Sequence, residues 1–157
     1  MRDDLEHFEL WAAEQLARVS PAQRRKLALS IARELRRRQA ERIAQQTNPD
    51  GTPYAPRKRG QSKRAGARAS QRRIKRQAMF MKLRTARWLT VSATVDGAEV
   101  GFRGRVAQIA AVHQHGERAP VAPNGPAYRY PRRVLLGLTD TDRQSIRDAL
   151  IDFLSPR

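Results

Sequence analysis

The chain has 157 residues, a length that predicts one domain with one substantial hydrophobic core. It carries 32 Lys and Arg residues against 15 Asp and Glu, a formal net charge of +17 that predicts an anionic partner, self-association, or both. There is no cysteine, no apolar run of membrane-spanning length and no signal-peptide pattern, so we expect a protein without disulfides that is made in the cytoplasm and binds no membrane.

Two amphipathic helices are predicted in residues 1–46. The first, from residue 3 to about residue 18, has one apolar stripe with helical period: Leu5, Phe8, Trp11, Ala12 and Leu16. The second begins at Ser20 and Pro21, where the serine can cap the helix and Gln23 can complete a capping box. Its apolar positions are Leu27, Ile31, Leu35 and Ile43. The short connection makes an antiparallel pair possible.

Residues 47–76 interrupt this pattern and are predicted to form an extended, flexible, basic arm. Pro49-Asp50-Gly51 is a turn signal, because proline fixes φ and glycine tolerates a positive one. Residues 60–70 contain nothing apolar larger than alanine, so we expect them to be disordered in the free protein. Residues 52–95 contain no acidic residue. A plain linker remains an alternative to a functional arm.

Residues 77–157 are predicted to form an α+β core. Apolar and polar residues alternate over residues 89–95, and Asp96-Gly97 predicts a hairpin turn before a returning strand at residues 98–102. A short helix is expected from residue 104 to Gly116, with Val106, Ile109, Ala110 and His113 on its inner face.

The rest of this core is predicted to contain a loop, a strand and a helix. Residues 117–127 are rich in proline and read as a surface loop, and residues 128–138 as a third strand that Pro131 interrupts. Thr139 and Asp142 form a capping box for a final helix, whose inward residues are expected to be Ile146, Leu150 and Phe153. The expected fold is therefore α+β: a helical pair, a basic arm, and a small antiparallel sheet packed against helices.

Residues capable of catalysis do not cluster in the sequence. His113, His115 and Glu117 are the nearest approach to a metal site, but residues two apart on a helix point about 200° from each other. We expect His113 to pack inward, with His115 and Gly116 ending the helix. No phosphate-binding loop or nucleophile elbow is present. We therefore expect no enzyme, no cofactor and no metal.

The basic arm suggests a nucleic-acid-binding protein as one function. Its cations could neutralise phosphates without reading sequence, since recognition helices, zinc fingers and aromatic ladders are lacking. The residues assigned to contact DNA or an acidic partner are Arg57, Lys58, Arg59, Lys63, Arg64, Arg68, Arg72, Arg73, Lys75 and Arg76. A solvated arm without a ligand is the alternative.

Four segments, in order and with similar spacing, resemble the phage virion morphogenesis family, the tail completion proteins of Mu-like and related temperate tailed phages. They are NPDGTPYAPRK (residues 48–58), MFMKLRTARWL (79–89), VGFRGRVAQIAAVHQHG (100–116) and YPRRVLLGLTDTD (130–142). Residues 1–40 match only in helical character and in a polar surface.

The resemblance implies a non-enzymatic virion protein with a fold like that of tail terminators. Such subunits close into a ring, typically a hexamer, that caps the tail tube and presents a surface to the head-side neck or connector protein. The implied partners are other copies of this chain, the tail tube protein, the neck protein and, non-specifically, genome DNA in the lumen. A subunit-docking arm is implied for Pro49, Asp50, Gly51, Tyr54 and Pro56. The implied location is the tail or neck of the virion.

Overall fold

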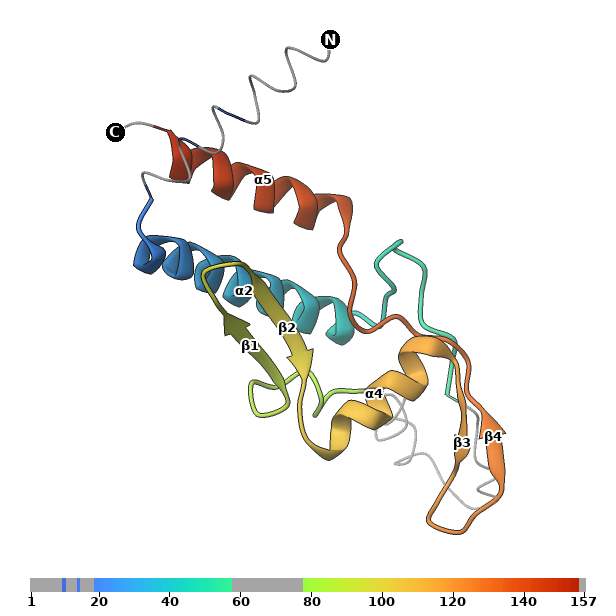
Figure 1. Ribbon diagram of the computed structural model, residues 1–157. Coiled ribbons are helices and arrows are strands. Elements are labelled where there is room, and N and C mark those ends of the chain that lie inside the picture. Colours follow the sequence, from blue (N-terminus) through green and yellow to red (C-terminus); the bar gives the residue numbers. More distant parts are fainter. Residues whose placement is uncertain (1–9, 11–13, 15–18, 58–77, 156–157) are drawn as a thin grey trace. The chain divides into compact units, whose positions relative to one another are not determined.

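The computed structural model describes residues 10, 14, 19–57 and 78–155 (Figure 1). The elements are α2 (Pro21–Ala44), β1 (Leu89–Ala93), β2 (Ala98–Phe102), α4 (Arg105–His115), β3 (Arg118–Pro120), β4 (Ala127–Arg129) and α5 (Asp140–Leu154). These residues form three helices and two small antiparallel sheets, which confirms the predicted α+β class. The predicted first helix falls almost wholly outside the described residues, as does the stretch 58–76 of the basic arm.

The chain divides into two compact units, each considered by itself. The first contains Met1–Leu35, Val91–Val100 and Asp140–Arg157, and the second contains Arg36–Thr90 and Gly101–Thr139. Both α2 and the β1–β2 hairpin contribute residues to each unit.

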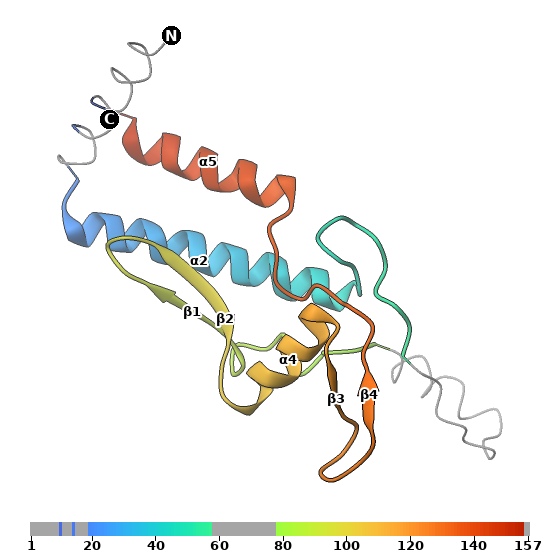
Figure 2. The ribbon, with the colours of Figure 1, turned by 45° about the vertical axis from the view of Figure 1, so that its right-hand side comes forward.

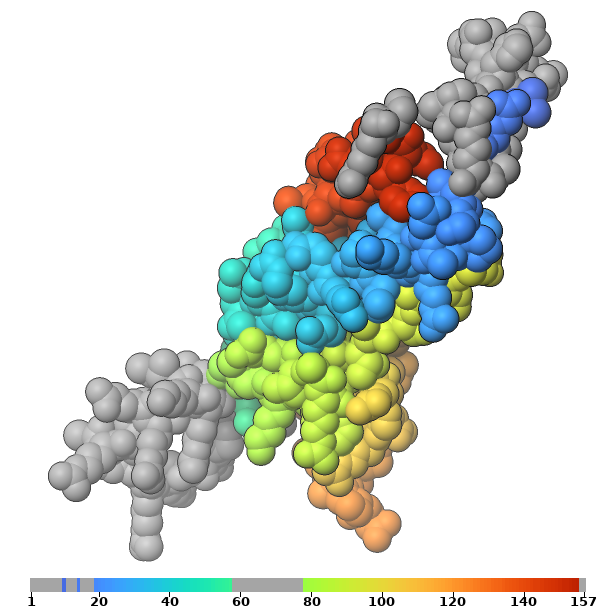
Figure 3. Space-filling view, turned by 90° about the vertical axis from the view of Figure 1, so that its left-hand side faces the viewer, coloured from blue at the N-terminus to red at the C-terminus, as the bar shows by residue number. Residues whose placement is uncertain are grey.

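The predicted start of α2 is confirmed. The Ser20 backbone N–H donates to Gln23 Oε1 at 2.9 Å, and the Gln23 N–H donates to Ser20 Oγ at 3.2 Å. This is the reciprocal capping box, which satisfies two donors that the first helical turn leaves without intrahelical acceptors. Figure 3 shows side chains of α2, coloured from blue to cyan, at the surface. The exposed residues of this helix include Arg25, Lys26 and Arg33.

The final helix, α5, also lies where it was predicted, but its buried stripe is narrower. Asp142 is buried, and Ile146 and Phe153 are partly buried. Leu150 is 41% exposed, so the prediction that it faces inward is wrong. At about 100° per residue, Leu150 is rotated about 40° from Ile146 and about 60° from Phe153, which places it at the edge of the stripe.

The β1–β2 hairpin confirms the Asp96-Gly97 turn signal. The Thr94 N–H donates to the Gly97 carbonyl at 2.9 Å and closes the turn. The first strand ends at Ala93 rather than at Val95, which is exposed.

The core of the second unit joins residues from several parts of the sequence. Its buried members are Ile43, Tyr54, Ala110 and Leu135, and the apolar residues packed against them are Met79, Phe80, Leu83 and Phe102. The helix α4 ends as predicted at Gly116, whose φ of 69° gives a left-handed cap. Ile109, predicted on the inner face, is instead 50% exposed, because it lies about 60° around the helix from Val106.

The third predicted strand does not join the first hairpin. Residues 118–120 and 127–129 form a second hairpin, β3–β4, whose paired residues are Arg118 with Arg129, Ala119 with Tyr128, and Pro120 with Ala127 (Figure 2). Its turn contains Asn124 at a φ of 61° and is closed by the Gly125 N–H bonding to the Ala122 carbonyl. Residues 121–126 therefore turn the chain back on itself, and the strand ends before Pro131, which has no N–H to donate.

Candidate functional site

In the second unit, the segment that follows β4 is hydrogen-bonded to side chains from several distant parts of the sequence. We call residues 131–138 the strap. The strap belongs to neither sheet, yet Leu135 and Arg133 within it are buried. Buried backbone groups need hydrogen-bond partners, and here side chains from α2, α4 and residues 45–57 provide them.

Gln114, near the end of α4, binds the strap most extensively. Its Oε1 accepts the N–H groups of Leu135 at 2.8 Å and Leu136 at 3.0 Å. Its Nε2 donates to the Leu136 carbonyl at 2.8 Å. One amide side chain thus occupies the place that a neighbouring strand would take in a sheet.

The end of α2 and the residues after it hold the other side of the strap. Arg42 donates through Nη1 to the Val134 carbonyl at 2.9 Å and through Nη2 to the Leu135 carbonyl at 2.8 Å. Asn48 Oδ1 accepts the Val134 N–H at 2.8 Å. Every backbone N–H and C=O from Val134 to Leu136 is therefore bonded to a side chain.

Gln46 makes a similar contact with the segment that precedes the first hairpin. Its side-chain amide pairs with both backbone groups of Met79, through Oε1 to the N–H at 2.6 Å and through Nε2 to the carbonyl at 2.9 Å. Gln46 has a φ of 60°, an uncommon conformation for a residue with a side chain. These bonds offset the cost of that conformation and fix the chain direction after α2.

Arg133 lies at the centre of the site with its guanidinium turned inward and is 3% exposed. It donates to the carbonyls of Ala55 at 2.8 Å and Pro56 at 3.1 Å, and its Nη1 lies 3.0 Å from His113 Nδ1. In the described part of the chain no carboxylate contacts it. Burial lowers the pKa of Arg133, although an arginine stays protonated in proteins.

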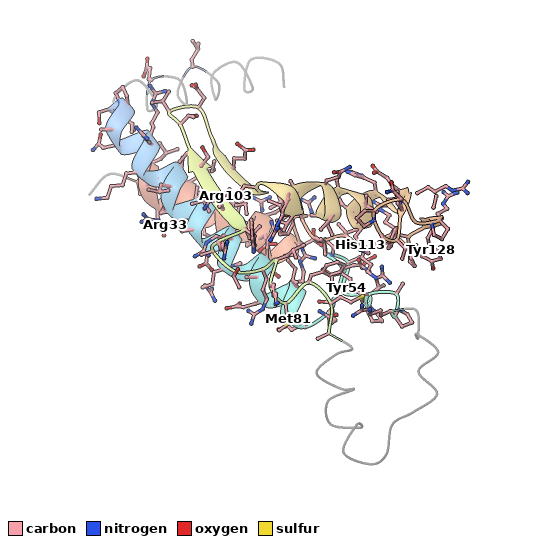
Figure 4. The ribbon with its side chains drawn as sticks, turned by 90° about the horizontal axis from the view of Figure 1, so that it is seen from below. Arg33, Tyr54, Met81, Arg103, His113 and Tyr128 are labelled. Carbon is pink, nitrogen blue, oxygen red and sulfur yellow. The ribbon has the colours of Figure 1, made fainter. Side chains whose placement is uncertain are left out.

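His113, the side chain that Arg133 contacts, has a partly buried ring and a lowered pKa. Its ring packs edge-on against Phe80 at 4.8 Å and Tyr130 at 4.9 Å between centroids, in the region labelled in Figure 4. Burial, and then the charge of Arg133, lower the pKa of His113 to about 4. The neutral ring can accept the Arg133 hydrogen bond at Nδ1, and the inward packing predicted from the sequence is confirmed.

The loop after α2 divides into a buried part and an exposed tip. Tyr54 is 6% exposed within the core, and Pro49 packs beside Gly137 of the strap. Asp50 and Gly51 are exposed, as are residues 52 and 53. Hydrogen bonds from the hydroxyl and N–H of Thr52 lower the pKa of Asp50 and close the turn predicted there.

The predicted binding residues therefore have different positions. Pro49 and Tyr54 pack within this chain, whereas Asp50, Gly51, Pro56 and Arg57 are exposed. The other nine basic residues assigned to DNA or an acidic partner lie outside the described residues. Docking of this loop onto another subunit stays a prediction.

In addition to the exposed loop tip, the structure has a surface hollow that was not predicted from the sequence. An open hollow of about 690 Å³ is lined by residues at the end of α4 and along both strands of the second hairpin: His115, Gly116, Glu117, Arg118, Ala127, Tyr128 and Arg129. Asn124-Gly125 was the signal for this hairpin, since it is a preferred turn dipeptide, but the surrounding prolines favoured a plain loop.

No group of three His, Asp or Glu residues in residues 19–57 and 78–155 could hold a metal ion. Within the same residues, no helix is both long and apolar enough to cross a membrane. The buried side chains of Arg42 and Arg133 donate to backbone carbonyls and so hold irregular backbone of the second unit in place.

Comparison with known proteins agrees with the family resemblance. Residues 3–155 match the phage virion morphogenesis family. The chain belongs to this family. It is also 36% identical over 153 residues to tail completion protein S of Escherichia phage P2, a match that covers 97% of this chain and 98% of that protein. No solved structure matches. Because the virion morphogenesis match is nearly end to end, it includes the strap, both hairpins and the basic segment.

Proposed function

We propose that this protein is a structural component of phage tail completion, which acts late in assembly as a ring subunit at the end of the tail tube. The observation that carries the proposal is the end-to-end match to a protein named for tail completion. The second unit supports it, because its buried polar side chains hold irregular backbone in place and leave the exposed loop and hairpin for contacts with other proteins.

In this proposal the subunits close into a ring, most simply a hexamer, that caps the tube protein and presents a surface to the head-side connector. The exposed tip of residues 50–53 docks on the adjacent copy, and the basic segment from Arg57 to Arg76 contacts acidic neighbours or DNA in the lumen. Cyclic rings use heterologous contacts, so an extended segment of one copy can lie on the next. The protein is then located in the tail or neck of the virion and performs no catalysis.

Deletion of the gene in the phage that encodes this chain is the direct test. We expect lysates with heads and tails that remain separate, and tails without a closed head-proximal end, in negative-stain electron microscopy. A plasmid copy of the gene should restore infectious particles. Normal joined particles from the deletion phage would refute the proposal. A defect confined to head filling, with tails that join normally to added heads, would refute it as well.

The alternative function is sequence-nonspecific binding of nucleic acid by the basic segment, and the +17 charge of the chain favours it. Counterion release predicts an affinity for duplex DNA that falls by orders of magnitude between low and moderate salt. Replacement of the ten basic residues between Arg57 and Arg76 by Gln separates the two functions. If DNA binding is lost and plasmid rescue of infectivity persists, tail completion does not depend on DNA contact. Loss of rescue, with the variant still incorporated into tails that close and join to heads, would favour the nucleic-acid function.

A further inference from the structure

We propose that the β3–β4 hairpin of one copy binds the exposed face of α5 in the next copy, with Arg118 and Arg129 against Asp148 and Asp152. The proposal rests on the self-assembly in the proposed function and identifies surfaces that mediate it. The partner is a second copy of this chain, chosen because the two faces match in charge, in spacing and in their exposed apolar side chains.

The two hairpin arginines form an unfavourable pair within one chain. The bonds from the Tyr130 N–H to the Glu117 carbonyl and from the Val121 N–H to the Pro126 carbonyl fix the alternation of the ladder. Arg118 and Arg129, which are paired in the register, therefore occupy a non-hydrogen-bonded position, where facing side chains are closest. Like charges directly opposite each other destabilise a sheet.

Nothing in the described part of the chain compensates this pair. Neither guanidinium has a hydrogen-bond or ion-pair partner among the described residues, and both residues are exposed. Glu117 is adjacent in sequence, but successive strand residues point to opposite faces, so it lies on the other side of the hairpin. Repulsion between two arginines that no other group of the described chain offsets points to a partner that supplies negative charge.

The same face of the hairpin offers an apolar surface on a rigid ribbon. Pro120 and Ala127 form the next non-hydrogen-bonded pair and are exposed. The ribbon is braced at its turn by the Gly125 to Ala122 backbone bond of 2.8 Å and by three prolines at residues 120, 123 and 126. A rigid ribbon loses little conformational entropy when it binds.

The complementary face is on α5. Of the three helices that the structure describes, α5 alone has more acidic than basic residues, four Asp against two Arg. Both of its arginines are engaged on the helix itself, Arg143 with Asp140 at 3.2 Å and Arg147 with Gln144 at 3.0 Å. Asp148 and Asp152 are exposed, and no ion pair within residues 19–57 and 78–155 neutralises them.

Spacing and apolar content also agree. Asp148 and Asp152 are four residues apart on one helix, which separates their Cβ atoms by about 5–6 Å. A directly opposed cross-strand pair such as Arg118 and Arg129 has a Cβ separation of about 4.5–5.5 Å. Ile151 lies beside the two aspartates and is 56% exposed, so it can pack against Pro120 and Ala127.

This contact also addresses the repulsion between copies of a chain of charge +17. Association of identical basic subunits requires that positive surface meet negative surface locally. A hairpin-to-α5 contact is heterologous, since each copy uses one face for the preceding copy and the other for the next, as ring closure requires.

Charge reversal with mixing tests the contact in the full-length protein. One variant carries R118E and R129E, and the other carries D148K and D152K. Sedimentation velocity over a range of concentrations at fixed salt should show each variant associating at least about tenfold more weakly than wild type. An equimolar mixture should recover the wild-type association, because each variant's altered face meets the complementary altered face of the other.

The controls change charge equally at other sites. R25E with K26E on α2, and D96K with E99K on the first hairpin, alter exposed residues by the same net charge and should leave association within about threefold of wild type. Recovery only when all four reversals are on one chain, and not on mixing, would mean an intramolecular contact and would overturn the inference.

Three further outcomes separate this inference from the proposed function. If wild type assembles and the reversals have no greater effect than their controls, the hairpin-to-α5 contact is refuted and the ring is not. Weaker association in the arginine variant alone would also refute it, since the hairpin would then bind something other than α5. If wild type never associates, even with isolated tail tubes, the proposed ring fails and the contact fails with it.

Discussion

Replacement of Gln114 by alanine is the sharpest test of how the strap is held. The change removes three hydrogen bonds, those to the N–H groups of Leu135 and Leu136 and to the Leu136 carbonyl. Each buried group left without a partner costs about 1–3 kcal/mol. These bonds are only partly buried, so water can replace some of what is lost, and we take about 1 kcal/mol for each group.

The expected loss in the free energy of unfolding is therefore about 3 kcal/mol. For a chain of this size it lowers the melting temperature by about 6–12 °C, because 1 kcal/mol corresponds to about 2–4 °C. Urea unfolding followed by circular dichroism at low protein concentration measures the free energy, and calorimetry measures the melting temperature.

The matched control is Gln144→Ala on α5. Both substitutions replace Gln by Ala within a helix, so the change in helix propensity is the same. Gln144, however, is exposed, and its hydrogen bonds go to side chains on its own helix. We expect a change within about 0.5 kcal/mol. If Gln114→Ala were no more destabilising than Gln144→Ala, side chains would not be what holds the strap, and the account of its burial would be wrong.

Three further predictions concern the same unit. Gly137→Ala should destabilise by about 1–3 kcal/mol in urea unfolding, because the new Cβ would lie 2.6 Å from Pro49 Cγ, whereas Gly97→Ala meets open space and should be nearly neutral. Because the pKa of His113 falls from 6.5 to about 4 on folding, the unfolded chain binds more protons between these values and stability decreases as pH falls through that window. After allowance for partial exposure the loss is about 1–2 kcal/mol, and His113→Gln should flatten that part of the pH profile. Arg133→Lys should cost about 1–3 kcal/mol by thermal unfolding, since a lysine cannot bond both backbone carbonyls and the histidine.

Local signals in the sequence predicted the elements that depend on a few neighbouring residues. The Ser20 capping box, the Asp96-Gly97 turn and the Gly116 cap each use contacts within four residues, and all three are present. Periodicity predicted the existence of α4 and α5. It placed Ile109 and Leu150 on the buried faces of these helices, whereas both residues are exposed. A sequence stripe shows which residues could be buried, and the neighbouring chain decides how wide the buried stripe is.

The candidate site could be predicted only in part, because its contacts join distant residues. Tyr54 stands alone in a stretch rich in proline and glycine, and its burial depends on Leu135 and Ala110. Gln114 reads as an ordinary helical residue, since nothing near it in the sequence shows that its amide will bind a segment about 20 residues away. The inward His113 was predictable because Val106 and Ala110, which are buried, lie on the same face of α4.

Burial of the arginines changes what the high net charge can mean for function. Arg42 and Arg133 contribute to the +17 of the chain, yet backbone carbonyls hold both of them inside the second unit. An arginine that backbone carbonyls hold inside the unit serves the fold, and its loss should act through stability rather than through a partner. Arg118 and Arg129 are exposed and lack partners among the described residues, so their reversal should change association and leave the unfolding free energy nearly constant, because one like-charged pair replaces another. If substitutions of the buried arginines change stability and those of the hairpin arginines change association, the role of each of these charges is known. The composition gives only the net charge.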